Sequence, residues 1–107
     1  ALQNEDGSLP LIQVGLDWEN TFSQHETQGQ GAQTDVALPP DEFNRLAQSV
    51  VEQINNALAR NLYPAVVTSA KRRRFIRAVL HAKKIRNPVL SYEEIDSGLK
   101  PLLIGTA

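Results

Sequence analysis

The chain has no cysteine and no methionine, and only six of its 107 residues are aromatic. Without cysteine it can form no disulfide, no thiolate metal site and no cysteine nucleophile. No apolar run approaches the roughly 18 residues that a membrane-spanning helix requires, and the first residues lack the basic and apolar regions of a signal peptide. These absences predict a cytoplasmic domain that does not itself span a membrane. The missing methionine is compatible with a fragment of a longer chain or with removal of an initiator methionine before Ala1.

Charge is distributed unevenly along the chain, although the formal net charge is only −1. Residues 1–52 carry nine acidic side chains and one Lys or Arg, whereas residues 53–92 carry nine Lys or Arg and no acidic side chain. Eight of the eleven Lys and Arg residues lie within residues 68–92. Because the whole chain is not basic, nucleic-acid binding is a poor explanation for this segment.

Apolar segments that alternate with amphipathic segments predict an α/β fold. The expected strands cover residues 11–14, 63–69, 87–92 and 100–106, and the expected helices cover residues 41–60 and 72–82. Long helices between strands make parallel crossovers, so we expect a small, mostly parallel sheet of about four strands flanked by amphipathic helices. The link before the last strand is too short for a normal crossover, which favours an antiparallel edge strand at that position.

The length is that of one domain with its own core. We expect residues 1–10 to be an incoming linker and residues 11–107 to form a single α/β subdomain. The polar segment near residues 25–37, rich in Gly and Gln, has nothing to bury and is predicted to be a mobile loop. Side chains able to cap a helix lie at or just after the ends of three of the expected strands: Asp17, Thr68 or Ser69, and Ser91.

The basic segment is predicted to be an amphipathic helix with an exposed charged face. Its apolar stripe consists of Phe75, Ile76, Val79, Leu80 and Ala82. Arg72 and Lys83 fall at the two ends of that stripe, where their long side chains are expected to reach water. The other basic side chains form a candidate protein-docking face: Arg73, Arg74, Arg77, His81 and Lys84.

Two alternatives to docking compete for this face. A run of charge is most often simply a solvated surface. Nucleic acid is a poorer partner, because no aromatic side chain interleaves with the exposed arginines to stack on bases. Cations at the start of a helix are unfavourable unless an anion or a carboxylate neutralises them, and this favours docking against an acidic protein surface.

No arrangement of residues predicts catalysis. His25 and His81 are far apart in the sequence and lack carboxylates at ligand spacing. The adjacent Glu93 and Glu94 would point apart rather than act as an acid–base pair, and no Gly-rich phosphate loop follows a strand. We therefore expect a protein that is not an enzyme and that has neither a cofactor nor a metal site.

A regulatory module is the competing interpretation. Asp17, the hydroxyl of Thr68 or Ser69, and Lys100 are similar to the acceptor aspartate, hydroxyl and lysine of the receiver domains of two-component signalling. The segment after Lys100 predicts a strand where that family has a helix, and the first strand lacks an acidic pair upstream. A receiver-like or anion-binding regulatory α/β module is accordingly the alternative function.

The segments "YPAVVTSAKRRRFIRAVL", "NPVLSYEEI" and "LLIGTA" resemble the C-terminal end of the FlhA family, the export gates of flagellar and injectisome type III secretion. Upstream, "LIQVGLDWENTF" and "VALPPDEFNRL" are similar to the strand, turn and amphipathic helix of that family, so the likeness covers nearly the whole chain. Ala70 stands where the family pattern has a proline, and Arg72, Arg73 and Arg74 make the helix start more basic than usual. The matching positions are Val66, Val67, Thr68, Ser69, Arg73, Arg77, Val89, Leu90, Ser91, Tyr92, Glu94 and Ile95.

The resemblance implies a non-enzymatic terminal subdomain in the cytoplasmic part of a bacterial inner-membrane protein, of the flagellar branch. Its implied partners are the other subdomains and the neighbouring subunits of a ring-forming export gate, and nucleic acid is not among them. Chaperones and substrates would bind through the full-length protein, because the chaperone groove of the family lies upstream of this chain. The implied role is to contribute to ring assembly and to the regulation of chaperone–substrate entry.

Overall fold

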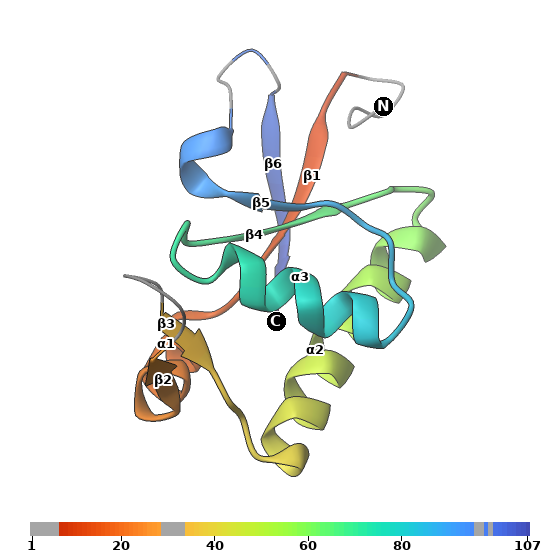
Figure 1. The fold of residues 1–107 in the computed structure, drawn as a ribbon. Coiled ribbons are helices and arrows are strands. Elements are labelled where there is room, and N and C mark those ends of the chain that lie inside the picture. The colour runs from red at the N-terminus through yellow and green to blue at the C-terminus, as the bar shows by residue number, and fades with distance from the viewer. Residues whose placement is uncertain (1–6, 29–33, 96–97, 99) are drawn as a thin grey trace.

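The computed structural model describes residues 7–28, 34–95, 98 and 100–107. Figure 1 shows the sheet with α2 and α3 beside it, and β2 and β3 next to α1. The elements are, in chain order, β1 (Leu9–Gln13), α1 (Leu16–Gln24), β2 (Glu26–Gln28), β3 (Thr34–Val36), α2 (Pro40–Ala59), β4 (Ala65–Thr68), α3 (Arg73–Ala82), β5 (Val89–Ser91), the 3-10 turn η1 (Tyr92–Glu94) and β6 (Pro101–Thr106).

Four strands form one sheet in the order β5-β4-β1-β6, and all its neighbouring pairs are parallel. The predicted α/β class with a mostly parallel sheet is therefore confirmed. The predicted antiparallel orientation of the last strand is wrong, because β6 is an edge strand but runs parallel to β1. Residues 92–94 form η1, which rises about 2 Å per residue, and residues 95–100 can span at most about 20 Å, so the link reaches about 26 Å at most. That reach covers three strand spacings of about 4.8 Å and the short return along the three residues of β5, so no helical crossover is needed.

The two faces of the sheet contribute to two separate apolar clusters. Ile12 of β1 and Val66 of β4 belong to the larger cluster, which α2 and α3 help to build. The neighbouring residues of each strand point to the opposite face, as the pleat requires. The cluster on that second face consists of Leu9, Leu11, Ala65 and Val67, with Leu90 and Ile95 packed against it.

The start of β1 is part of the sheet and not of a linker. Leu9 is fully buried, and its N–H donates to the carbonyl O of Lys100 at 3.1 Å. The sheet therefore includes Leu9 and Pro10, which were predicted to belong to the incoming linker. Residues 1–6 of that predicted linker lie outside the described residues. Within the described parts of the chain, no helix combines the length and apolarity needed to cross a membrane.

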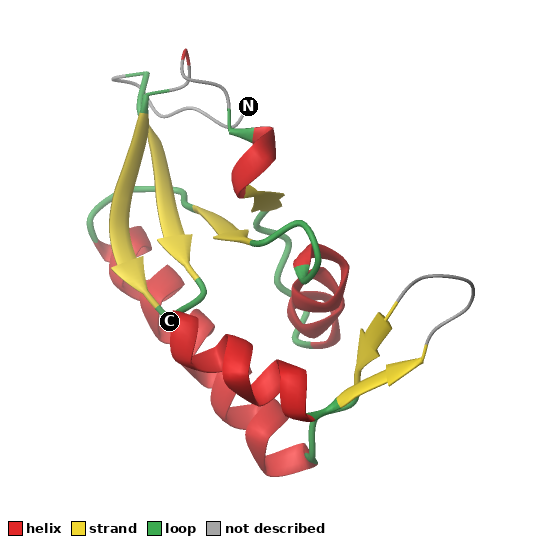
Figure 2. Cartoon of the chain, turned by 90° about the vertical axis from the view of Figure 1, so that its left-hand side faces the viewer, coloured by secondary structure: helices red, strands yellow, loops and turns green. Residues whose placement is uncertain are grey.

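The segment predicted to be a mobile loop near residues 25–37 has paired strands at its two ends. β2 and β3 are antiparallel, with Glu26 opposite Val36 and Thr27 opposite Asp35. Figure 2 shows this pair projecting from the rest of the chain. The remainder of the predicted loop, residues 29–33, lies outside the described residues. Sequence pattern missed the pair because three-residue strands with at most one apolar side chain, Val36, carry no apolar alternation.

The predicted helix caps are confirmed in one case out of three. Ser91 precedes η1, and its backbone N–H donates to the carboxylate of Glu94 at 2.9 Å. Asp17 lies inside the first turn of α1 rather than before it. Thr68 and Ser69 do not cap α3, because the chain makes a further turn before that helix begins.

Candidate functional site

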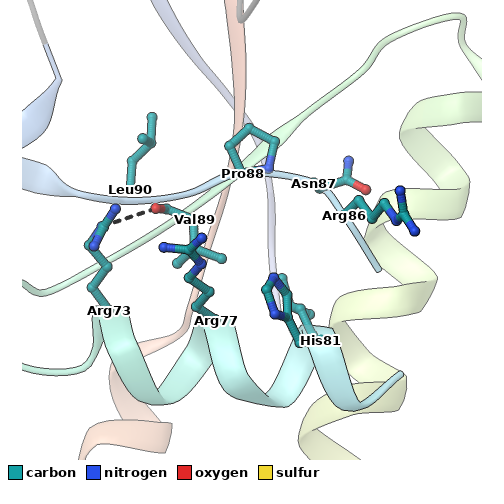
Figure 3. A pocket seen from close by; sticks show the side chains of 9 residues that line it. Arg73, Arg77, His81, Arg86, Asn87, Pro88, Val89 and Leu90 are labelled. Atoms are coloured by element: carbon teal, nitrogen blue, oxygen red, sulfur yellow. Dashed lines mark hydrogen bonds between the residues drawn. The ribbon is translucent and has the colours of Figure 1, made fainter. Parts of the chain in front are cut away.

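Three basic side chains of α3 line a hollow beside the edge strand β5. Arg73, Arg77 and His81 come from the helix, and Arg86 joins them from the segment that leads into the strand. Figure 3 shows the three α3 side chains rising from the helix toward the backbone of β5. The hollow has a volume of about 240 Å³, and we call it the α3–β5 hollow.

Helix spacing and one turn explain why these residues meet. Arg73, Arg77 and His81 are four residues apart, and residues with that spacing are neighbours on one face of a helix. After the helix, Lys84 adopts a left-handed conformation with φ 60°, which turns the chain back. This turn brings Arg86 to the hollow just before β5 begins.

One carboxylate pairs with a basic side chain of the hollow, Arg73 at the start of α3. Arg73 Nε lies 2.7 Å from Glu94 Oε1 and donates to the carbonyl O of Val89 at 3.2 Å. The same Glu94 Oε1 accepts a hydrogen bond from the backbone N–H of Ser91 at 2.9 Å. The Arg73–Glu94 ion pair therefore touches a carbonyl and an N–H of β5 at once.

The surroundings of Glu94 keep it ionised. The backbone N–H of Ser91 and, to a smaller extent, the hydroxyl of Ser91 and the charge of Arg73 lower the pKa of Glu94 below its ordinary value of 4.5. Because the folded-state pKa is lowered, the stabilisation from these contacts is complete above the ordinary value and is lost as the pH falls through the lowered one. The ion pair is therefore fully formed at neutral pH.

The other basic residues of the hollow have no carboxylate against them. Among the residues that the structure describes, Arg77, His81 and Arg86 take part in no ion pair. Three arginines thus face one glutamate. The α3–β5 hollow offers guanidinium donors to a carboxylate or another anion.

The predicted docking face is only partly brought together. Arg73, Arg77 and His81 line the α3–β5 hollow, as described above. Arg74 instead turns toward the β2–β3 pair, where its Nη2 lies 3.2 Å from Asp35 Oδ1. Lys84 is exposed at the turn beyond the end of α3 and does not line the hollow.

Two residues of this site, Arg86 in the hollow and Glu94 against Arg73, were not predicted from the sequence. Arg86 lies beyond the helix, so a projection along the helix axis could not place it with Arg77. Glu94 had a usable signal, because a serine followed three residues later by a glutamate is the pattern of a capping box, and Ser91 and Glu94 fit it. That pattern places the Glu94 carboxylate beside the backbone of Ser91, at the end of β5.

Arg72 corrects the prediction that its side chain would reach water. The side chain is only 1% exposed, and its guanidinium lies 5.8 Å from the ring centroid of Phe22. Its Nε donates to both carboxylate oxygens of Glu19, at 3.0 and 3.1 Å, and its Nη2 lies 2.6 Å from Glu26 Oε1. Arg72 therefore ties the start of α3 to both α1 and β2.

These contacts shift the pKa of Arg72 upward and that of Glu26 downward. Hydrogen bonds to Glu19 and Glu26 raise the pKa of Arg72 against the opposing effect of burial. The hydrogen bond from Arg72, with a smaller one from Lys71, lowers the pKa of Glu26. Lys71 and Arg72, just before α3, are thus neutralised by carboxylates of α1 and β2. The first two arginines of α3 have other partners, Glu94 for Arg73 and Asp35 for Arg74.

The three residues of the receiver-like interpretation do not meet. Thr68 ends β4 and Asp17 follows β1, so both lie toward the carboxyl ends of the parallel strands. Lys100 precedes β6, and its carbonyl accepts from Leu9 at the opposite ends of the same strands. A strand of five residues is about 16 Å long, which is too far for an acceptor site that needs all three groups around one ion.

The histidines are also separated, since His25 follows α1 and His81 lies in α3. Within the described residues, no three His, Asp or Glu side chains are grouped so that they could hold a metal ion.

Comparison with known proteins gives a consistent result across nearly the whole chain. A family model described as the FHIPEP family matches residues 1–100. Over 95 residues the chain is 28% identical to the flagellar biosynthesis protein FlhA of Caulobacter vibrioides. The matched part is 89% of this chain but 13% of that relative, so the chain spans a small part of its length.

Solved structures with the same fold cover nearly the whole chain. The nonameric SctV-C of EPEC matches 99% of this chain and 31% of that one, with a TM-score of 0.79 at 17% identity. The C-terminal domain of InvA matches 96% and 31%, with a TM-score of 0.78 at 23% identity. The MxiA protein of Shigella flexneri matches 97% and 33%, with a TM-score of 0.76 at 19% identity. At these identities the likeness establishes the fold.

Proposed function

The chain belongs to the FHIPEP family, and we infer from this membership that it is the terminal subdomain in the cytoplasmic part of a type III protein-export gate. The observation that carries the proposal is the family match over residues 1–100. The relative from Caulobacter vibrioides is a flagellar biosynthesis protein, which supports the flagellar branch. The likeness to the C-terminal domain of InvA supports the terminal position.

The proposed partners are proteins. They are the other subdomains and the neighbouring subunits of a ring, and the ring is supported by the nonameric state of SctV-C. Export chaperones and their substrates are engaged through the full-length protein rather than by this subdomain alone. The subdomain contributes to ring assembly and to the control of chaperone–substrate entry, and the full-length protein lies in the bacterial inner membrane with this part in the cytoplasm.

The role is one of interaction and not of catalysis. Within the described residues the α3–β5 hollow presents cationic donors without a nucleophile–base pair. A cationic surface that Glu94 neutralises only in part is suited to reversible contact with acidic protein surfaces. The proposed contact face is Arg73, Arg77 and His81, with Arg86 added by the fold.

The test is export by the full-length protein after removal of residues 7–107. We expect the truncated protein to reach the membrane, as an immunoblot of membranes would report, but to secrete no substrate into the medium. Restoring the full-length protein should restore secretion. Normal secretion by the truncated protein would show that this part is dispensable for export.

A further inference from the structure

The outer edge of β5 is blocked by side chains in the pattern that a neighbouring strand would produce. In the parallel pairing of β4 with β5, the N–H of Val66 donates to the carbonyl O of Pro88, so Pro88 and Leu90 direct their backbone groups toward β4. The alternate residues, Val89 and Ser91, direct theirs away from the sheet. One of these outward groups, the carbonyl O of Val89, accepts from Arg73, and another, the N–H of Ser91, donates to Glu94.

The geometry of these two contacts matches one residue of a parallel strand. In a parallel ladder, each residue donates its N–H to the carbonyl before its opposite number and accepts from the N–H after it. A residue opposite Leu90 would therefore donate to Val89 O and accept from Ser91 N–H. Arg73 Nε and Glu94 Oε1 occupy these two positions, at 3.2 and 2.9 Å, and lie 2.7 Å from each other.

The Arg73–Glu94 ion pair is accessible to solvent, so a group from another molecule can replace one of its partners. The side chains of Arg73 and Glu94 are 36% and 42% exposed. An exposed pair of this kind contributes little to stability, so opening it costs little. An unprotected edge strand is a template for pairing with another chain, and side chains that cover it are a usual protection.

The charge beside the edge indicates which chain would replace the pair. When Glu94 moves away, Arg73, Arg77 and Arg86 line the α3–β5 hollow with no opposing carboxylate among the described residues. An incoming carboxylate could take the place of Glu94 against Arg73 and gain the further attraction of Arg77 and Arg86. Arginine is well suited to this, since its donors match a carboxylate geometrically.

We propose that β5 is a docking edge for an extended acidic segment of a partner protein, which adds as a parallel strand beside β5 while its carboxylates enter the α3–β5 hollow. Glu94 is the internal competitor that holds Arg73 and covers the edge until the partner arrives. The inference deepens the proposed docking function and rests on it for the existence of a protein partner.

The test is a titration of the chain with a short acetylated peptide in which glutamate alternates with threonine. Binding is monitored in NMR spectra through the amide resonances of Val89 and Ser91. Glu94→Gln keeps an oxygen that can accept from Ser91 but removes the charge that competes for Arg73. We expect it to bind the peptide about fivefold more tightly than the unchanged chain, because a like charge at the site is removed. Arg77→Gln with Arg86→Gln should weaken binding about tenfold.

Two controls separate this mechanism from a general effect of charge. Glu93→Gln makes the same change at an adjacent exposed residue and should leave the affinity unchanged. A peptide alternating glutamine with threonine should not bind. Equal tightening by Glu93→Gln, or weaker binding by Glu94→Gln, would overturn the role of Glu94 as competitor.

Other outcomes would overturn the docking edge itself. Absence of peptide binding by every variant would exclude it, and inorganic phosphate that binds more tightly than the peptide would make the hollow a simple anion site. Because the titration uses the chain alone, it does not depend on export. If the Arg77→Gln and Arg86→Gln changes blocked secretion while no variant bound the peptide, the docking function would stand and strand addition would be wrong.

Discussion

A chain carrying Val67→Asp should not fold. Val67 is 1% exposed in the middle of β4, in the cluster on the face of the sheet opposite α2 and α3. An unpaired carboxylate at this position costs several kcal/mol, against a stability of about 5 to 15 kcal/mol for a domain. We expect no cooperative thermal transition in circular dichroism and collapsed dispersion in the NMR spectrum.

The matched control introduces the same carboxylate at an exposed leucine. Leu103 of β6 is 55% exposed, so Leu103→Asp should keep the cooperative transition and lower the free energy of unfolding by no more than about 1 kcal/mol. A Val67→Asp chain that melts like the Leu103→Asp chain would show that β4 is not a buried central strand.

Arg72→Met should be the most destabilising change at any charged residue of the basic segment. The substitution keeps an apolar stem in a buried position but leaves Glu19 and Glu26 without the cation that they share. Breaking a buried ion pair in this way costs about 3 kcal/mol, which for a domain of this length lowers the melting temperature by more than about 10 °C. Arg72 Nη1 is buried without a hydrogen-bond partner among the described residues, and its removal offsets part of that loss.

Two comparisons distinguish the loss of this ion pair from a simple loss of positive charge: the same substitution at a second arginine, and the same measurement in acid. Arg77→Met removes the same group from an exposed position of α3 and should change the free energy of unfolding by less than about 0.5 kcal/mol. The hydrogen bond from Arg72 lowers the pKa of Glu26, so its contribution is present above the ordinary value of 4.5 and is lost as the pH falls through the lowered value. The two variants should therefore differ less in acid than at neutral pH in urea unfolding, and a difference that grows in acid would contradict the role of this pair.

The sequence predicted the main elements well, because those elements have strong local patterns. The stripe of α2 recurs with helical spacing, and Leu46, Val50 and Ile54 are all buried. The short apolar run before Thr68 is one uninterrupted buried strand. These features depend on neighbours within one element, which is the information that periodicity contains.

Features that depend on distant residues were the ones missed. The position of Arg72 at the end of an apolar stripe is compatible with both exposure and burial, and only the partners Glu19 and Glu26, which lie about 50 residues upstream, decide between them. Arg86 reaches the α3–β5 hollow through a left-handed turn at Lys84. A left-handed conformation can be predicted from sequence where glycine or asparagine stands, but a lysine gives no such signal. Long-range contacts and such turns are set by the fold as a whole and leave no regular spacing.

The measurement that tests the central claim most directly is secretion by the full-length protein carrying Arg77→Gln and Arg86→Gln. The matched control carries Arg60→Gln and Lys84→Gln, which remove the same two charges from exposed positions outside the α3–β5 hollow. If the hollow is a docking surface for protein carboxylates, the first protein should reach the membrane normally but secrete at least about tenfold less substrate, while the control secretes at the normal level. Secretion at the normal level by both proteins would show that the basic face of α3 is only solvated and has no part in export.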